Sequence, residues 1–121
     1  MFADSPFSLR IGEHSDSLAA AHLHHRVECS AYITACNPFG KLLDESTNAR
    51  LHASLKRELE QRHFAFFEGV GDHESGRWPG ETSFLVFGLP LEEAKALGLR
   101  LDQNAIVWAG TDATPQLILL R

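Results

Sequence analysis

The sequence predicts an α+β fold with a ferredoxin-like split β-α-β-β-α-β sheet that carries both of its helices on one face. Two observations support this prediction. From residue 29 onward, four short apolar segments of strand length alternate with two helical segments in that order. Right-handed crossover connections then place both helices on the same face of the sheet. With an extra N-terminal helix and a C-terminal hairpin strand, residues 1–121 are expected to form a single α+β domain.

Alternating or continuous apolar residues predict the strands. In residues 29–36, for example, Ala31, Ile33 and Ala35 share one face of an extended chain. The other segments are rich in β-branched and aromatic residues and are bounded by turn residues. A weaker alternation near the N-terminus permits a short edge strand. The predicted strands are residues 7–11, 29–36, 64–68, 83–87, 104–109 and 116–120.

Helical periodicity and capping residues predict three helices. Leucines recur at every fourth position within residues 46–62, so they form one apolar stripe. The Ser-Asp-Ser sequence that begins at Ser15 favours the start of an earlier helix, which ends near residue 26. Pro90 favours the start of a third helix over residues 91–97, and Gly98 is expected to stop it.

Residues 69–80 are predicted to form a loop because they include four glycines and one proline. A loop of this length in a compact domain is typical of a functional segment. Trp78 near its end has two interpretations. It either closes over a ligand as part of a lid, or it packs permanently against the aromatic residues of the neighbouring strands.

Composition limits the classes of partner. The formal net charge of −5 argues against a surface built on phosphate contacts, so nucleic acid is not an expected partner. A base-stacking sheet face would have to use Tyr32, Phe66 and Phe84 or Phe87. No segment approaches the roughly 20 apolar residues of a membrane helix, so no membrane association is expected.

Cysteine usage predicts a cytoplasmic protein. Cys29 and Cys36 are too few for a secreted disulfide framework. In one extended strand, with a rise of about 3.3 Å per residue, they would lie far beyond disulfide reach. Residues 1–12 include Asp4 and Arg10 and do not resemble a secretory signal.

The predicted topology brings several polar residues to one end of the sheet, which we call the rim. Strands 29–36 and 64–68 run in one direction and strands 83–87 and 104–109 in the other, so their turns meet there. Amides, hydroxyls and carboxylates beside a tryptophan are typical of a small-molecule site. Backbone N–H groups at the start of the long helix would favour an anionic group. The candidate ligand-binding residues are Thr34, Asn37, Asn48, Glu68, Trp78, Glu81, Ser83, Gln103 and Asn104.

Each of these polar residues also has a structural interpretation. Asn37 precedes a proline and suits a turn, and Asn48 suits the first turns of the long helix. Gln103 and Asn104 could instead bind buried backbone groups at the sheet edge. The sequence leaves both interpretations open.

Catalysis also stays open, without a diagnostic motif. Ser83 lacks the G-x-S-x-G context of a hydrolase nucleophile. Cys36 with His52 or His73 would form a nucleophile–base pair if the fold brought them together. Glu68 and Glu81 are candidates for an acid–base couple at the rim.

No metal or cofactor is expected from the motifs. His22, His24 and His25 lie close together, but neither they nor the two cysteines have the tight ligand spacing of a zinc site. We interpret these histidines as a polar helix face. The glycines of residues 69–80 match no phosphate-binding fingerprint.

Three sequence blocks resemble a known family. They are T-A-C-N-P at residues 34–38, W-P-G-E-T-S at residues 78–83 and Q-N-A-I-V-W at residues 103–108. Together they are similar to Domain of Unknown Function 3293, an uncharacterised bacterial family. Thr82 stands where many members carry a second acidic residue, which argues against paired carboxylates there. The resemblance implies a small bacterial cytoplasmic protein, and it implies no particular activity because none is established for the family.

The last predicted strand supports a second hypothesis, of a different class. Four consecutive apolar residues, 117–120, make both faces of this strand apolar. An exposed edge of this kind favours pairing with another chain, so the alternative function is a homodimer or other interaction module without catalytic activity. Alternatively, residues 7–11 or the helix that contains Leu18 cover this strand.

Overall fold

The computed structural model describes residues 9–71 and 81–121 and has the predicted α+β architecture. Five antiparallel strands form one sheet in the order β2-β3-β1-β4-β5. The strands are β1 (Ser30–Ile33), β2 (Ala65–Gly71), β3 (Glu81–Phe87), β4 (Ala105–Ala109) and β5 (Gln116–Leu119). The helices are α1 (Asp16–His24), α2 (Glu45–Gln61) and α3 (Leu91–Arg100), with a short 3-10 helix η1 (Pro38–Gly40).

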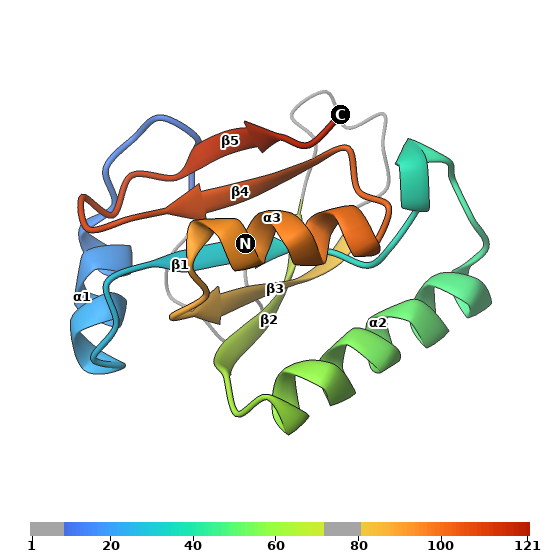
Figure 1. Cartoon of the computed structure of the whole chain (residues 1–121), viewed down its shortest axis with the longest axis horizontal. Helices are drawn as coiled ribbons and strands as arrows, with labels where there is room; N and C mark the ends of the chain where they lie inside the picture. The colour runs from blue at the N-terminus through green and yellow to red at the C-terminus, as the bar shows by residue number, and fades with distance from the viewer. Residues whose placement is uncertain (1–8, 72–80) are drawn as a thin grey trace.

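Strand direction defines the two ends of the sheet. β3 is antiparallel to both β1 and β2, so β1 and β2 run the same way. β4 is antiparallel to β1 and therefore runs with β3. The chain consequently leaves β1 and β2, and enters β3 and β4, at the same end of the sheet. This end is the rim, on the right in Figure 1, where η1 and the start of α2 lie.

The two faces of the sheet are covered by different helices. α2 and α3 cover one face, and α3 crosses in front of β1 and β4 in Figure 1. Their apolar stripes pack on the inward residues of β1, β3 and β4, and the burial of these side chains drives the assembly. Leu18 of α1 packs on the opposite face. The main core cluster includes Ala31, Ile33, Ala35, Leu55, Leu59, Phe84, Val86, Ala94, Leu97 and Ile106.

Two of the three histidines expected on a polar helix face, His22 and His25, are packing residues, so that prediction is wrong for them, whereas His24 is exposed. His22 is only 5% exposed, and its Nε2 lies 2.8 Å from Oγ of Ser30. The His25 ring stacks on Phe87 with a centroid separation of 4.2 Å. Burial lowers the pKa of His22. These rings therefore attach α1 to the sheet.

Gly98 lies inside α3, so the prediction that it stops the helix is wrong. A Cβ at this position would lie 2.7 Å from Cδ1 of Leu120 and 2.8 Å from Cγ2 of Ile106. The glycine thus lets α3 approach β4 and the end of the chain closely. α3 ends two residues later, at Arg100, and Asp102 beyond it adopts a left-handed conformation with φ of 57°.

Several predicted boundaries differ from the structure. β2 continues to Gly71, because Gly69, Val70 and Gly71 pair with β3, so the expected loop over residues 69–80 begins later. Residues 72–80, which include Trp78 and His73, lie outside the described residues. The expected edge strand over residues 7–11 is not seen at residues 9–11, where the chain enters a turn.

The aromatic residues considered for base stacking do not share one open face. Phe66 and Phe84 lie on the face that α2 and α3 cover. Tyr32 and Phe87 belong to the opposite face, where Phe87 is buried beneath α1. None of the helices in residues 9–71 and 81–121 combines the length and apolar character needed to cross a bilayer.

Candidate functional site

Thr34 joins the end of β1 to the beginning of β3. Its hydroxyl donates a hydrogen bond to the backbone oxygen of Thr82 at 2.8 Å. The same Oγ1 accepts from the backbone N–H of Cys36 at 3.0 Å. A threonine serves here because one hydroxyl can both donate and accept. The first two of the three sequence blocks therefore meet at the rim.

Asn37 and Asn48 form a reciprocal pair that connects β1 to α2. The Asn48 Oδ1 accepts from the backbone N–H of Asn37 at 2.9 Å, and its Nδ2 donates to Asn37 Oδ1 at 2.9 Å. Asn37 Oδ1 also accepts from the N–H of Leu43 at 2.8 Å. Asn37 has a φ of 50°, a conformation that asparagine tolerates better than most residues. Both amides hold the turn together, as in the structural interpretation.

Gln103 connects the third block to the first. Its Nε2 donates to the backbone oxygen of Cys36 at 3.1 Å, and the residue is only 8% exposed. The backbone of Phe39 donates to Asp102 at 2.6 Å in the same region. The neighbouring Asn104 is exposed, and its backbone oxygen accepts from Leu120. The three blocks thus converge, mainly through contacts that support the turns.

The remaining candidate residues have different positions. Ser83 is 1% exposed, and the alternation of β3 places it on the opposite face from Thr82. Glu81 begins β3. Glu68 lies within β2 opposite Phe84, on the face that α2 covers. Trp78 lies outside the described residues.

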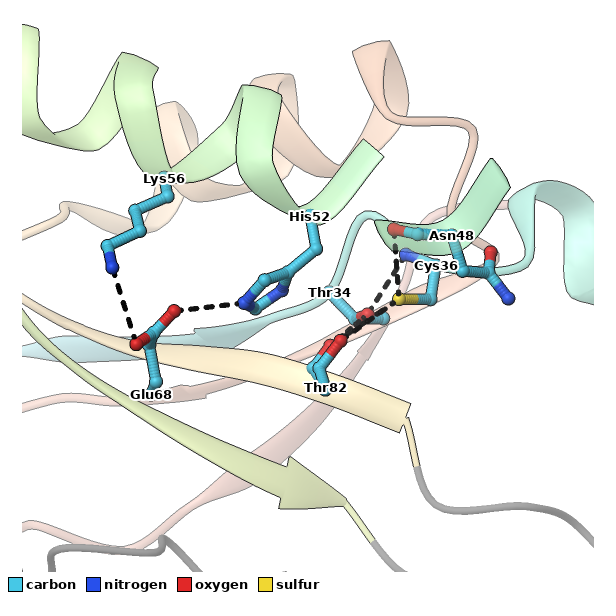
Figure 2. A network of polar contacts seen from close by, with 7 residues as sticks. All are labelled: Thr34, Cys36, Asn48, His52, Lys56, Glu68 and Thr82. Carbon is cyan, nitrogen blue, oxygen red and sulfur yellow. Dashed lines mark hydrogen bonds and ion pairs between the residues drawn. The ribbon is translucent and has the colours of Figure 1, made fainter. Parts of the chain in front are cut away.

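A charged cluster links α2 to β2 (Figure 2), and we name it the His52 cluster: His52, Lys56 and Glu68. His52 Nε2 lies 3.0 Å from Oε1 of Glu68, and Lys56 Nζ lies 3.6 Å from its Oε2. The His52 ring stacks on Phe84 at a centroid separation of 4.3 Å and an angle of 8°. Lys56 was not among the candidate residues predicted from the sequence. The four-residue spacing of His52 and Lys56, which puts both on one helix face, could have indicated it.

The second ring nitrogen of His52 is buried without a hydrogen-bond partner among the described residues. Its Nε2 is held by Glu68, which favours the tautomer with the proton on Nε2. Nδ1 is then an acceptor without a donor. Leaving such a buried group unpaired costs about 1–3 kcal/mol. A hydrogen-bond donor placed beside Nδ1 would therefore stabilise the ring.

Cys36 is buried among oxygen atoms beside this cluster. The residue is 3% exposed, and its Sγ lies 3.4 Å from Oγ1 of Thr82 and 4.0 Å from the backbone oxygen of Asn48. Its polar neighbours are oxygen atoms, whereas nucleophilic cysteines lie beside cations. Within residues 9–71 and 81–121, no hydrogen bond joins Cys36 to His52. The geometry thus favours a structural role for this thiol.

The start of α2 is already occupied by negative charge. Asp44 is the residue before the helix, and Glu45 lies in its first turn. The Thr47 hydroxyl donates to the Asp44 carboxylate, and this hydrogen bond lowers the pKa of Asp44. These carboxylates interact favourably with the positive end of the helix dipole. An anionic ligand would therefore be repelled at the position where the sequence suggested an anion site.

The antiparallel sheet, with two helices on one face and hydrogen-bonded turns at the rim, defines an α+β protein. The chain belongs to the family described as Protein of unknown function (DUF3293), whose model matches residues 33–106. This membership confirms the resemblance of the three blocks. No curated protein and no solved structure matched the chain.

Proposed function

We propose that the protein binds a small molecule at the rim, with the His52 cluster as the contact surface. The carrying observation is the unpaired Nδ1 of His52 beside a charged, half-exposed pair. A ligand that reorients the ring or supplies a donor recovers the energy of the missing hydrogen bond. Asn37, Asn48 and Gln103 hold the turns beneath this surface. Of the candidate ligand-binding residues predicted from the sequence, this proposal keeps Glu68 as a direct ligand contact and gives Asn37, Asn48 and Gln103 a supporting role.

The cluster favours a ligand that carries an anionic group and a hydrogen-bond donor. The side chains of Lys56 and Glu68 are 42% and 45% exposed, so both are accessible to a small molecule. Lys56 attracts the anion, and Nδ1 of His52 accepts from the donor once the ring turns toward the ligand. Glu68 sets the orientation of the imidazole from its other side. This arrangement resembles the few polar groups that orient ligands in ordinary binding sites.

Thermal-shift screening of small anionic metabolites and nucleotides tests the proposal. A ligand present at 100 times its Kd stabilises the native state by about 2.7 kcal/mol, which is easily measured. We expect the shift to disappear in Lys56→Met and Glu68→Gln. The matched control is Lys95→Met, because Lys95 forms a comparable ion pair with Glu92 on α3. The proposal fails if no compound raises Tm, or if Lys56→Met and Lys95→Met respond alike.

A second candidate function is self-association through β5. β5 is the last strand in the sheet order, and Leu117 and Leu119 are 51% and 71% exposed. Two copies could pair these strands in antiparallel fashion about a two-fold axis. Sedimentation at high micromolar concentration should then show a dimer, and Leu119→Lys should convert it to a monomer. A monomeric wild type would exclude this function.

We also propose that the fold is of the ferredoxin-like type and that the protein is bacterial and cytoplasmic. The strand order β2-β3-β1-β4 and the two helices on one face support the fold assignment. Two free cysteines support a reducing compartment. The family resemblance supports a bacterial source.

A further inference from the structure

An open groove lies at the end of the sheet opposite the rim. Its volume is about 570 Å³. The starts of α3 and β5 and the end of β4 meet there, on the left in Figure 1. It is separate from the His52 cluster, and none of its residues belongs to the proposed rim site. The lining residues are Glu28, Cys29, Pro90, Leu91, Trp108, Gly110, Thr111, Asp112 and Gln116.

Trp108 forms a fixed aromatic wall of this groove. Its Nε1 donates to the backbone oxygen of Leu89 at 3.0 Å, and its ring packs against the main core. Gly110 lies under the outer part of the indole: a Cβ there would be 3.1 Å from Cη2 and from Cζ3. The ring is therefore held in place by a hydrogen bond and by close packing. A preorganised wall loses little conformational entropy when a ligand binds.

The groove is negatively charged. Its described lining includes the carboxylates of Glu28 and Asp112 and no Lys, Arg or His. Glu28 is exposed and forms no ion pair among the described residues. One oxygen of Asp112 accepts from the backbone of Thr114, and the other oxygen has no such partner. His14 contacts the backbone of this segment: its Nδ1 lies 2.6 Å from the backbone oxygen of Asp112.

The start of α3 changes the electrostatic potential of the groove only slightly. Leu91 is the first residue of α3 and lines the groove, so the positive end of the helix dipole points near it. The first turn also carries Glu92 and Glu93, which offset this partial charge. Their carboxylates form ion pairs with Lys95 and Arg62, so they add little to the negative potential of the groove. Glu28 and Asp112 remain the dominant charges.

We propose that this groove binds a small organic cation, that is, an ammonium group on a short apolar body. Tryptophan is the best aromatic partner for a cation, and two carboxylates beside it add charge complementarity. The apolar body of the ligand would lie on Pro90 and Leu91. The net charge of −5 favours the approach of a cation to this surface. The inference is independent of the function proposed for the rim.

A titration with choline tests this inference, because its uncharged isostere 3,3-dimethylbutan-1-ol has nearly the same shape. We expect choline to shift the indole N–H resonance of Trp108 and the amide of Gly110 in a saturable manner. The neutral alcohol should bind at least about tenfold more weakly. Sodium chloride should weaken the binding of choline and leave that of the alcohol unchanged.

Charge-removing variants complete the experiment. Glu28→Gln should fold normally, because this side chain is exposed, and should weaken choline binding about fivefold through the loss of one nearby charge. Glu60→Gln, an exposed carboxylate on α2, should leave the titration unchanged. Lys56→Met should also leave it unchanged, which separates this groove from the rim site. Equal binding of choline and the alcohol, or equal binding by Glu28→Gln and Glu60→Gln, would overturn the inference.

Discussion

The side chain of Asn48 accepts a hydrogen bond from the backbone N–H of Asn37 and donates one to the Asn37 side-chain oxygen, and this pair attaches the turn after β1 to the first turn of α2. Asn37 accepts one further hydrogen bond from Leu43 through the same oxygen. The pair thus provides hydrogen-bond partners for backbone and side-chain groups of a turn that lies between β1 and α2. Polar residues near the rim therefore divide into those that hold the turns and the partly exposed Lys56 and Glu68 of the His52 cluster.

Removing one half of this pair should destabilise the protein substantially. Asn48→Ala removes the side-chain oxygen that accepts from the N–H of Asn37, and Asn37 Oδ1 loses one donor. We expect the free energy of unfolding to fall by about 1–3 kcal/mol, the penalty for a buried polar group without a partner. Urea denaturation measures the change, and Ser46→Ala, an exposed serine on the same helix, is the control. A loss no larger than that of the control would show that the pair contributes little.

Gly98→Ala should destabilise the protein although alanine favours helices. The intrinsic gain for alanine in a helix is about 1 kcal/mol. The new Cβ would lie within 3 Å of Leu120 and Ile106, and overpacking of this kind costs typically about 1–3 kcal/mol. Adding Leu120→Ala should recover part of the loss, because the end of that side chain is one of the two obstacles. A stabilised Gly98→Ala variant would contradict the close approach of α3 and β4.

The three helices end with a left-handed residue other than glycine, and this feature offers a route to stabilisation. Arg26, His63 and Asp102 have φ values of 57°, 60° and 57°. At the end of α2, His63 donates to Glu60 and the next N–H donates to Leu59, as in a Schellman motif.

His63→Gly should therefore raise the free energy of unfolding. The substitution removes about 1–2 kcal/mol of strain from the left-handed backbone. Glycine also makes the unfolded chain more flexible, which destabilises the fold by about 0.5–1 kcal/mol, so a net stabilisation near 0.5–1 kcal/mol is expected. Glu60→Gly, an exposed position inside the same helix, should lower stability by about 1 kcal/mol. Thermal unfolding distinguishes these opposite signs, and a destabilised His63→Gly would refute the argument.

Acidification should weaken the fold through the buried His22. Burial lowers the pKa of His22, and burial together with the charge of His24 lowers that of His25. A folded-state pKa below the unfolded value near 6.5 means that the unfolded chain binds protons first. Stability contributed by these groups is thus complete above about pH 6.5 and decreases as the pH falls below it.

His14 acts in the opposite direction, since its hydrogen bond with the Asp112 carbonyl raises its pKa, but its exposure limits the effect. His22→Gln retains an amide to bind Ser30 and removes the titration. Urea unfolding at pH 7.5 and pH 5.5 should therefore show a smaller acid-induced loss in His22→Gln than in the wild type. Equal losses would exclude His22 as a source of the pH dependence.

Local patterns in the sequence were sufficient to predict most elements. The helix predicted from the leucine stripe over residues 46–62 is confirmed by α2. Such a stripe predicts a helix reliably because a helix that buries one face needs apolar residues at this spacing, whatever the rest of the fold. The strand segments follow similarly from alternating burial, as at Ala31, Ile33 and Ala35. Prediction failed at Gly98, where packing against Ile106 and Leu120 decides the role of a residue that usually ends helices.

The sequence by itself determined the α+β class, the approximate positions of most helices and strands and, through strand direction, the set of turns that share the rim. The tertiary structure decided what each polar residue does there. Asn37 and Asn48 are 11 residues apart and Gln103 is 67 residues from Cys36, so their hydrogen bonds exist only after folding. The same holds for the His52 cluster, whose ring stacks on Phe84 and binds Glu68 from another element. Side-chain chemistry states what a residue can bind, whereas contacts between distant segments decide which partner it binds.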